Sequence, residues 1–171
     1  MKPSDEALFS AETIALRVDE LAHEVSADYA DTSLVLIAVL KGALPFTADL
    51  MRALRIPVTM DVVRARSYVG RKPEGAVEFL AEPTVDLRGK RVLLIEDILD
   101  TGRTAHTILK RLETFGPEDV RFCTLLDKPS RREVAVDADY IGFEIDDCFV
   151  VGYGMDYEEN FRALPGIHIL E

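Results

Sequence analysis

The sequence contains little cysteine and few cations for its number of acids. Its two cysteines, Cys123 and Cys148, cannot form a disulfide framework and neither belongs to a CxxC pair, so we expect two small, buried apolar side chains. Lysine and arginine number 20 against 31 aspartate and glutamate, which gives a net charge of −11. That charge argues against non-specific binding to nucleic acid, which needs a basic surface.

Long apolar runs are also absent. The longest one, LVLIAVL at 34–40, has the length of a strand and is too short to span a bilayer. The first residues, MKPSDEALFS, lack the apolar core of a signal peptide. We therefore expect a cytoplasmic protein without membrane association, and 171 residues fit one domain, 1–171.

Apolar patterning predicts alternating strands and helices. Ser10 is a candidate N-cap for a first helix, in which Ile14, Val18, Leu21 and Val25 form one apolar face. Strands are predicted at 34–40, 57–68, 91–97 and 120–127, helices at 42–54 and 103–116, and short strands around 149–151 and 167–170. This order predicts an open, mainly parallel α/β sheet, whose ligands bind at the carboxyl ends of the strands.

One stretch, VLLIEDILDTGRTA, passes from a buried strand into a polar turn. Two adjacent acids, Glu96 and Asp97, end the strand, and Asp100 follows three residues later. The two carboxylates cannot bind a phosphate directly, but they can accept hydrogen bonds from sugar hydroxyls or hold the water shell of Mg²⁺. The alternative is a solvated strand end before an ordinary helix cap. Three acids beside a phosphate-like turn favour a ligand.

The turn that follows has the composition of an anion site. Gly102, the free backbone N–H groups and the hydroxyls of Thr101 and Thr104 can surround a phosphate at the start of the next helix. A carboxylate at Asp100 would repel that phosphate, so its side chain should turn elsewhere.

The same stretch resembles the signature of the phosphoribosyltransferases, which is an apolar strand, two acids and then Asp-Thr-Gly-x-Thr. The resemblance implies that Glu96 and Asp97 hold the ribose hydroxyls of phosphoribosyl pyrophosphate and contribute to metal binding. It also implies that the 5′-phosphate is bound by the turn residues, which are Thr101, Gly102, Arg103 and Thr104.

Two further segments resemble the purine members of the family. Lys41 and Gly42, in VLKGALPF, match the loop that receives the leaving pyrophosphate and contains a cis non-proline peptide. Ser67 and Tyr68, in RSYVG, resemble the mobile lid that closes over the site, with Val69 inserted before the glycine. Read alone, the first segment is a lysine at a strand end and the second an ordinary surface loop.

The segment LLDKPSRR places Lys128 just past the fourth strand. The lysine at this place in the hypoxanthine-guanine members donates to the 6-oxygen of the purine. Because an ammonium cannot accept a hydrogen bond from an amino group, it favours 6-oxopurines over adenine. Arg132 matches a contact to pyrophosphate, although a solvated basic turn is the plain alternative.

The segment FVVGYGMDYEENFR is similar to the family's base-and-metal segment. The resemblance implies that Phe149 stacks on the purine and that the Val150 backbone meets the base edge. Asp156 would hold a second Mg²⁺, and Arg162 would reach the pyrophosphate. Without the neighbouring motifs, Phe149 would more simply be a core aromatic.

These motifs occur in the family's order between 34 and 162. Their joint agreement implies a purine phosphoribosyltransferase, closest to the hypoxanthine-guanine members, with a core parallel sheet flanked by helices and a small hood from the C-terminal segment. Its substrates would be phosphoribosyl pyrophosphate and hypoxanthine or guanine, giving IMP or GMP with Mg²⁺ as cofactor. Asp100 would take the proton at N7 of the base.

Three points stay open at this stage. An enzyme of the same fold for another base, such as xanthine or a pyrimidine, is one alternative. Lys128 and Phe149 favour a 6-oxopurine, but xanthine is also one, so the sequence does not rank hypoxanthine, guanine and xanthine. A regulator that retains the phosphoribosyl pyrophosphate site and binds RNA or DNA is a second class, against which the acidic charge argues. The family usually forms dimers or tetramers, so a homodimer or homotetramer is expected.

Overall fold

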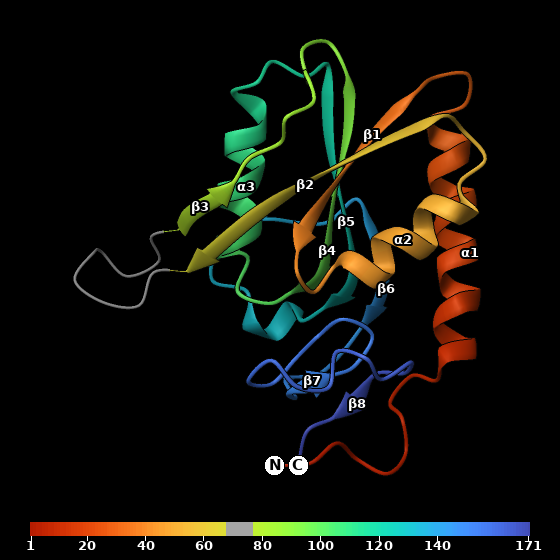
Figure 1. The fold of residues 1–171 in the computed structure, drawn as a ribbon, viewed down its shortest axis with the longest axis vertical. Coiled ribbons are helices and arrows are strands. Elements are labelled where there is room, and N and C mark those ends of the chain that lie inside the picture. The colour runs from red at the N-terminus through yellow and green to blue at the C-terminus, as the bar shows by residue number, and fades with distance from the viewer. Residues whose placement is uncertain (68–76) are drawn as a thin grey trace.

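The computed structural model describes residues 1–67 and 77–171 (Figure 1). Its main sheet has the strand order β3-β2-β1-β4-β5-β6, and its bounds are β1 Leu34–Leu40, β2 Val58–Ser67, β3 Val77–Ala81, β4 Arg91–Leu99, β5 Asp119–Asp127 and β6 Tyr140–Glu144. A second, two-stranded sheet pairs β7 Val150–Val151 with β8 His168–Ile169. The helices are α1 Ala11–Asp28, α2 Leu44–Ala53, α3 Arg103–Glu113 and the short 3₁₀ turn η1 Pro129–Arg131.

The main sheet is parallel apart from one edge, where β3 runs antiparallel to β2. Helices α1 and α2 cover one face and α3 covers the other (Figure 1). The side chains of β1 alternate between these two layers: Leu34 and Leu36 pack with α1 and α2, whereas Val35 and Ile37 pack with α3. A central strand buried on both faces needs a continuous apolar sequence. The predicted mainly parallel α/β sheet is confirmed.

Helix α1 begins where the sequence predicts. The Ser10 hydroxyl accepts a hydrogen bond from the backbone N–H of Thr13 at 3.2 Å, which satisfies one of the free donors of the first turn. The four predicted apolar positions are all buried: Ile14, Val18, Leu21 and Val25.

Helix α3 ends at Glu113, three residues before the predicted boundary at Gly116. The Thr114 hydroxyl donates to the Arg111 carbonyl at 2.7 Å, and the backbone N–H of Thr114 also points back to that carbonyl. These bonds tighten the last turn, and Gly116 follows with a φ of +72°.

The C-terminal segment forms the predicted hood over one end of the sheet, where β7 and β8 lie (Figure 1). The start of the chain joins this hood, which the sequence did not reveal. Pro3 bridges Leu170 and Phe9 bridges Ile167, so the two termini meet (Figure 1). The Phe9 ring also stacks on Phe143 of β6, with centroids 4.1 Å apart. None of the helices in the described part of the chain is long and apolar enough to cross a membrane.

Candidate active site

The predicted site residues gather at the carboxyl edge of the sheet. The loops that follow β1, β4 and β5 all leave this edge because the three strands are parallel. The hood covers the same edge, so residues that are far apart in the sequence face one another beneath it (Figure 1).

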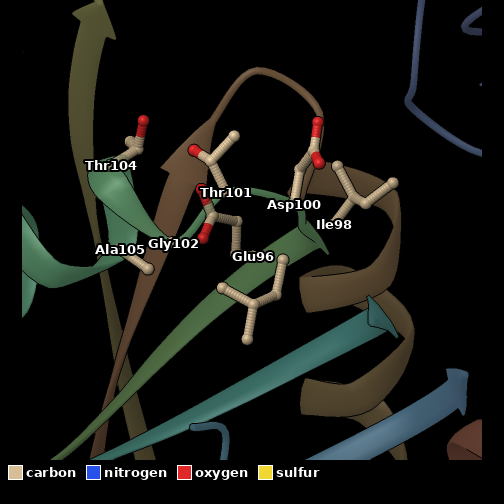
Figure 2. A pocket seen from close by; sticks show the side chains of 8 residues that line it. Glu96, Ile98, Asp100, Thr101, Gly102, Thr104 and Ala105 are labelled. Carbon is tan, nitrogen blue, oxygen red and sulfur yellow. The ribbon is translucent and has the colours of Figure 1, made fainter. Parts of the chain in front are cut away.

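A small hollow of about 60 Å³ lies where β4 turns into α3. Its lining is Glu96, Ile98, Leu99, Asp100, Thr101, Gly102, Thr104 and Ala105 (Figure 2). Gly102 has a φ of +84°, and a Cβ there would lie 2.6 Å from Cγ1 of Val136. Only glycine fits this turn, which lies at the start of α3, where the first backbone N–H groups have no partner within the helix. The N–H of Arg103 points to the Thr101 hydroxyl at 3.4 Å. The hollow has the size and the donors for a phosphate group.

A second hollow of about 230 Å³ lies under the hood. Its lining is Asp97, Ile98, Asp100, Lys128, Phe149, Val150, Met155 and Asp156. Apolar walls with a few polar groups are typical of a pocket for a flat organic ligand. Asp100 lines both hollows and so stands between the phosphate-sized one and the larger one.

Lys128 and Phe149 both line the larger hollow, but they differ in how much of each side chain is exposed to solvent. Lys128 is only 6% exposed, and its ammonium donates to the Cys148 carbonyl at 2.6 Å. Phe149 is 54% exposed, and its ring meets Tyr157 edge-on with centroids 5.8 Å apart. The exposed Phe149 ring is therefore not a core aromatic, and its face is available for stacking. The Val150 backbone belongs to β7, beside Phe149.

The acid pair near the end of β4 is largely desolvated, since Glu96 is buried and Asp97 is partly buried. Burial raises the pKa of the Glu96 carboxyl to about 8, and the neighbouring charge of Asp97 raises it as well. Burial also raises the pKa of Asp97 to about 6, against the lowering effect of backbone N–H groups and of the Arg162 charge. Buried carboxylates need hydrogen bonds or a cation, which sugar hydroxyls or a metal ion would supply.

The loop after β1 lies directly against this pair. The Leu40–Lys41 peptide is cis, as the resemblance to the family's loop implies. A Cβ at Gly42 would lie 1.8 Å from Oδ2 of Asp97, and a Cβ at Gly154 would lie 2.1 Å from the Gly42 carbonyl oxygen. The loop is therefore held tightly between the end of β4 and the hood, and both glycines are required by space.

Two of the three cationic side chains predicted for pyrophosphate, Lys41 and Arg162, come together at this loop. Lys41 Nζ lies 2.9 Å from Oε2 of Glu159, and Nη2 of Arg162 lies 3.4 Å from the same oxygen. Arg162 also pairs with Asp156 at 2.6 Å and donates to the Gly154 carbonyl at 2.7 Å. Its buried Nε–H has no acceptor within the described residues.

Arg132 and Arg103 make protein contacts instead. The guanidinium of Arg132 donates to the backbone carbonyls of Leu99 and Asp100 and to the Asp127 carboxylate, which fastens the end of β4 to the end of β5. Arg103 pairs with Glu133 at 2.6 Å. Substrate contacts for these two arginines stay predictions.

The structure also shows a residue at the site that the sequence did not single out. Arg131 Nε lies 3.2 Å from Oδ1 of Asp100 and 3.7 Å from Oδ1 of Asp147. Its only sequence signal is its place in the PSRR run, beside Arg132. The predicted lid contacts of Ser67 and Tyr68 cannot be followed, because Tyr68 and the side chain of Ser67 lie outside the described residues.

The acids of the site suit a hard cation but do not enclose one. Across residues 1–67 and 77–171, no group of three or more acid, histidine or cysteine side chains forms a metal cage. Asp156 is bound to Arg162 and accepts from the Glu159 backbone N–H at 2.8 Å. Carboxylate oxygens are ligands that Mg²⁺ prefers, and it commonly takes the rest of its shell from substrate phosphates and water. The donor set therefore fits Mg²⁺ carried in with a phosphorylated substrate.

Comparison with known proteins agrees with this geometry. Residues 4–158 match the family model described as phosphoribosyl transferase domain. The chain is 40% identical to the hypoxanthine phosphoribosyltransferase of Salmonella typhimurium, with 96% of this chain and 94% of that protein covered. It is 39% identical to the hypoxanthine-guanine phosphoribosyltransferase of Bacillus subtilis, with 98% and 93% covered.

Comparison with solved structures points to the same family. A crystal structure of a hypoxanthine-guanine phosphoribosyltransferase from Bacillus anthracis superposes with a TM-score of 0.95 at 40% identity, covering 99% of this chain and all of that one. The matches extend over the sheet, the site and the hood together. The chain belongs to the phosphoribosyltransferase family and, within it, groups with the hypoxanthine-guanine phosphoribosyltransferases.

Proposed function

We propose that this protein transfers the 5-phosphoribosyl group of phosphoribosyl pyrophosphate to hypoxanthine or guanine, giving IMP or GMP and pyrophosphate in purine salvage. The observation that carries the proposal is the position of Asp100 between a phosphate-sized hollow and a larger hollow that contains Lys128 and Phe149. A ribose can span the two with its 5′-phosphate in one and its anomeric carbon facing the other. The names of the relatives support the same activity.

The phosphoribosyl end is held by the turn and the acid pair. The N–H groups at the start of α3 and the hydroxyls of Thr101 and Thr104 bind the 5′-phosphate. Glu96 and Asp97 accept hydrogen bonds from the ribose hydroxyls, which relieves their burial.

In the reaction, the bond from the anomeric carbon to the pyrophosphate oxygen breaks and a bond to N9 of the purine forms. The anomeric carbon gains positive charge on the way, which the nearby carboxylates tolerate. Pyrophosphate leaves with the electron pair of the broken bond, and Lys41 and Arg162 neutralise it. The purine gives up the proton at N7, and Asp100 takes it as general base.

Mg²⁺ is the proposed cofactor. Glu96 and Asp97 would contribute to holding one Mg²⁺ and Asp156 would hold a second, with the substrate supplying the remaining oxygens. When bound, Mg²⁺ offsets the charge of the leaving pyrophosphate.

The larger hollow selects the base. Lys128 exchanges its bond to the Cys148 carbonyl for the 6-oxygen of the purine, and Phe149 stacks on the ring. Xanthine shares the 6-oxygen and is the second candidate base. The resemblance to the family implies a homodimer or homotetramer, and the sequence predicts that it lies in the cytoplasm.

The test is a comparison of three purines in wild-type protein and in Lys128→Gln, with Mg²⁺ and phosphoribosyl pyrophosphate present. Glutamine offers both a donor and an acceptor, so kcat/KM should fall for hypoxanthine and guanine and rise for adenine. Loss of a buried polar discrimination is worth about 10²-fold or more. Equal changes for all three purines would show that Lys128 does not read the 6-position, and absence of nucleotide from wild-type protein with every purine would refute the activity.

A further inference from the structure

One carboxylate of this protein forms ion pairs with both cations of the proposed pyrophosphate site. Oε2 of Glu159 lies 2.9 Å from Nζ of Lys41 and 3.4 Å from Nη2 of Arg162. A single oxygen thus bridges a cation from the loop after β1 and a cation from the hood. Both are charges that the substrate needs, so Glu159 stands where an anion of the ligand would stand.

The backbone holds Glu159 in this place. Its N–H donates to Oδ2 of Asp156 at 2.8 Å, and Tyr157 and Asn160 close the turn with a pair of backbone hydrogen bonds, 3.2 and 2.9 Å long. Glu158 and Glu159 both have positive φ, 50° and 63°. Successive left-handed residues are uncommon outside glycine, and here they direct the Glu159 side chain toward Lys41.

We infer that Glu159 is an internal competitor of the diphosphate: in the unliganded protein it binds Lys41 and Arg162, and it must be displaced before pyrophosphate or phosphoribosyl pyrophosphate can bind. The inference rests on the proposed function, because that function assigns both cations to the diphosphate. It adds a residue that lowers the affinity of the site rather than raising it.

Displacement of Glu159 is favourable, because the diphosphate binds the two cations better than one carboxylate does and because the released Glu159 side chain has room in solvent. A diphosphate brings several negative charges and more acceptor oxygens than one carboxylate, so it gains more from both cations. Glu159 has 67% of its side chain exposed and can turn into solvent once it is released. The apparent affinity for the diphosphate is lowered by the fraction of molecules in which the cations are already occupied.

The neighbouring Glu158 supplies a matched control. Glu158→Gln and Glu159→Gln each remove one negative charge from the same turn. Of these two glutamates, only the carboxylate of Glu159 contacts Lys41 and Arg162 within the described residues. Asp156, which also pairs with Arg162, is the same in both variants. A difference between the two variants therefore reports on the contact and not on the net charge.

The experiment is calorimetric titration of each intact protein with pyrophosphate in the presence of Mg²⁺, and then with phosphoribosyl pyrophosphate. Glu159→Gln should lower the Kd for pyrophosphate by about three- to tenfold, as expected when the ion pairs of Glu159 with Lys41 and Arg162 no longer oppose binding. Glu158→Gln should stay within about twofold of wild type. Glu159→Ala should match Glu159→Gln, which guards against a hydrogen bond made by the new amide.

The outcomes distinguish a failure of the inference about Glu159 from a failure of the proposed function. Equal Kd values in wild type and Glu159→Gln, or equal changes in the Glu158 and Glu159 variants, would overturn the inference. Weaker binding by both Glu159 variants would do so too, because Glu159 would then position Lys41 for the substrate. If wild-type protein binds neither pyrophosphate nor phosphoribosyl pyrophosphate, the proposed function fails first.

Discussion

Asp100 has a different role for its backbone and for its side chain. Its carbonyl is held by Arg132 and its carboxylate by Arg131, while the turn that follows faces the phosphate hollow. In Asp100→Asn the side chain keeps its size and can still accept from Arg131, so the fold should persist. The variant cannot accept the proton at N7, so kcat should fall by about 10²–10⁴-fold, the usual contribution of a general base.

Three measurements on Asp100→Asn decide this assignment: Tm, the Kd for phosphoribosyl pyrophosphate and kcat. We expect a nearly unchanged Tm, an unchanged or slightly lower Kd because one negative charge leaves, and the fall in kcat. A variant that binds the ribose donor and turns over near the wild-type rate would rule out Asp100 as the base. Ready unfolding would instead make Asp100 chiefly structural.

Gly42 is a second residue at which a small change, the addition of a Cβ, should lower activity. The Cβ of Gly42→Ala would overlap the Asp97 carboxylate, so Asp97 must move away from the ribose position. A displacement of about 1 Å at a reacting centre can cost about 10²-fold, and we expect a loss of that order in kcat/KM. Gly89→Ala is the control: it has no neighbour within 4 Å of the new Cβ, although its φ is +64°. It should lower the Tm and leave kcat/KM unchanged.

Residues were predictable from the sequence where their place depends on local chain order. Glu96 and Asp97 lie near the carboxyl end of β4 and Lys128 directly follows β5, so parallel pairing alone brings them to one edge. The contacts of Arg131 and Glu159 depend on which of several nearby charges each side chain meets after folding. Exposed ion pairs are weak and leave no pattern in the sequence.

Among the elements, the central strands were the most predictable. Strand β1 is a continuous apolar run, and β4 and β5 are largely apolar in their buried parts, as burial on both faces requires. The edge strand β6 lies in a tail that reads as irregular, and β3 follows a loop-like segment. Edge strands are half-paired and need no strong pattern, so their place in the sheet is set by tertiary contacts.

The pairing of the chain start with the hood gives a prediction for this element. Lys2, Ser4 and Phe9 share five backbone hydrogen bonds with Ile167, Ile169 and Glu171. Deleting residues 2–9 removes these bonds and the Phe9–Phe143 stack. The Tm should fall by at least about 5 °C. The KM for the purine should rise about tenfold or more, while the KM for phosphoribosyl pyrophosphate changes less, because the phosphate turn belongs to the sheet.

The control for this deletion is Leu16→Ala on α1, whose side chain is 67% exposed. It should leave the Tm and both KM values near wild type. If the deletion raises both KM values equally, the chain start stabilises the whole molecule and has no special role for the base.

For the whole molecule, the response to metal depends on how the ligands of the metal are divided between protein carboxylates and substrate oxygens. The described residues hold no cage of three or more ligands, so the free protein should bind Mg²⁺ weakly. Phosphoribosyl pyrophosphate should strengthen that binding in a titration followed by calorimetry. Activity should vanish with a chelator and return with Mg²⁺ or Mn²⁺. Full activity after exhaustive removal of divalent ions would contradict the mechanism.

The contact between Gly42 and Gly154 joins the two halves of the site. A Cβ at Gly154 of the hood would overlap the carbonyl oxygen of Gly42 in the loop after β1, and a Cβ at Gly42 would overlap the Asp97 carboxylate, so a shift of the hood is passed to this loop and to the end of β4. A ligand that moves either segment thereby changes the free energy of binding at its neighbour. Such coupling is reciprocal: whatever factor pyrophosphate imposes on the affinity for the purine, the purine imposes on the affinity for pyrophosphate.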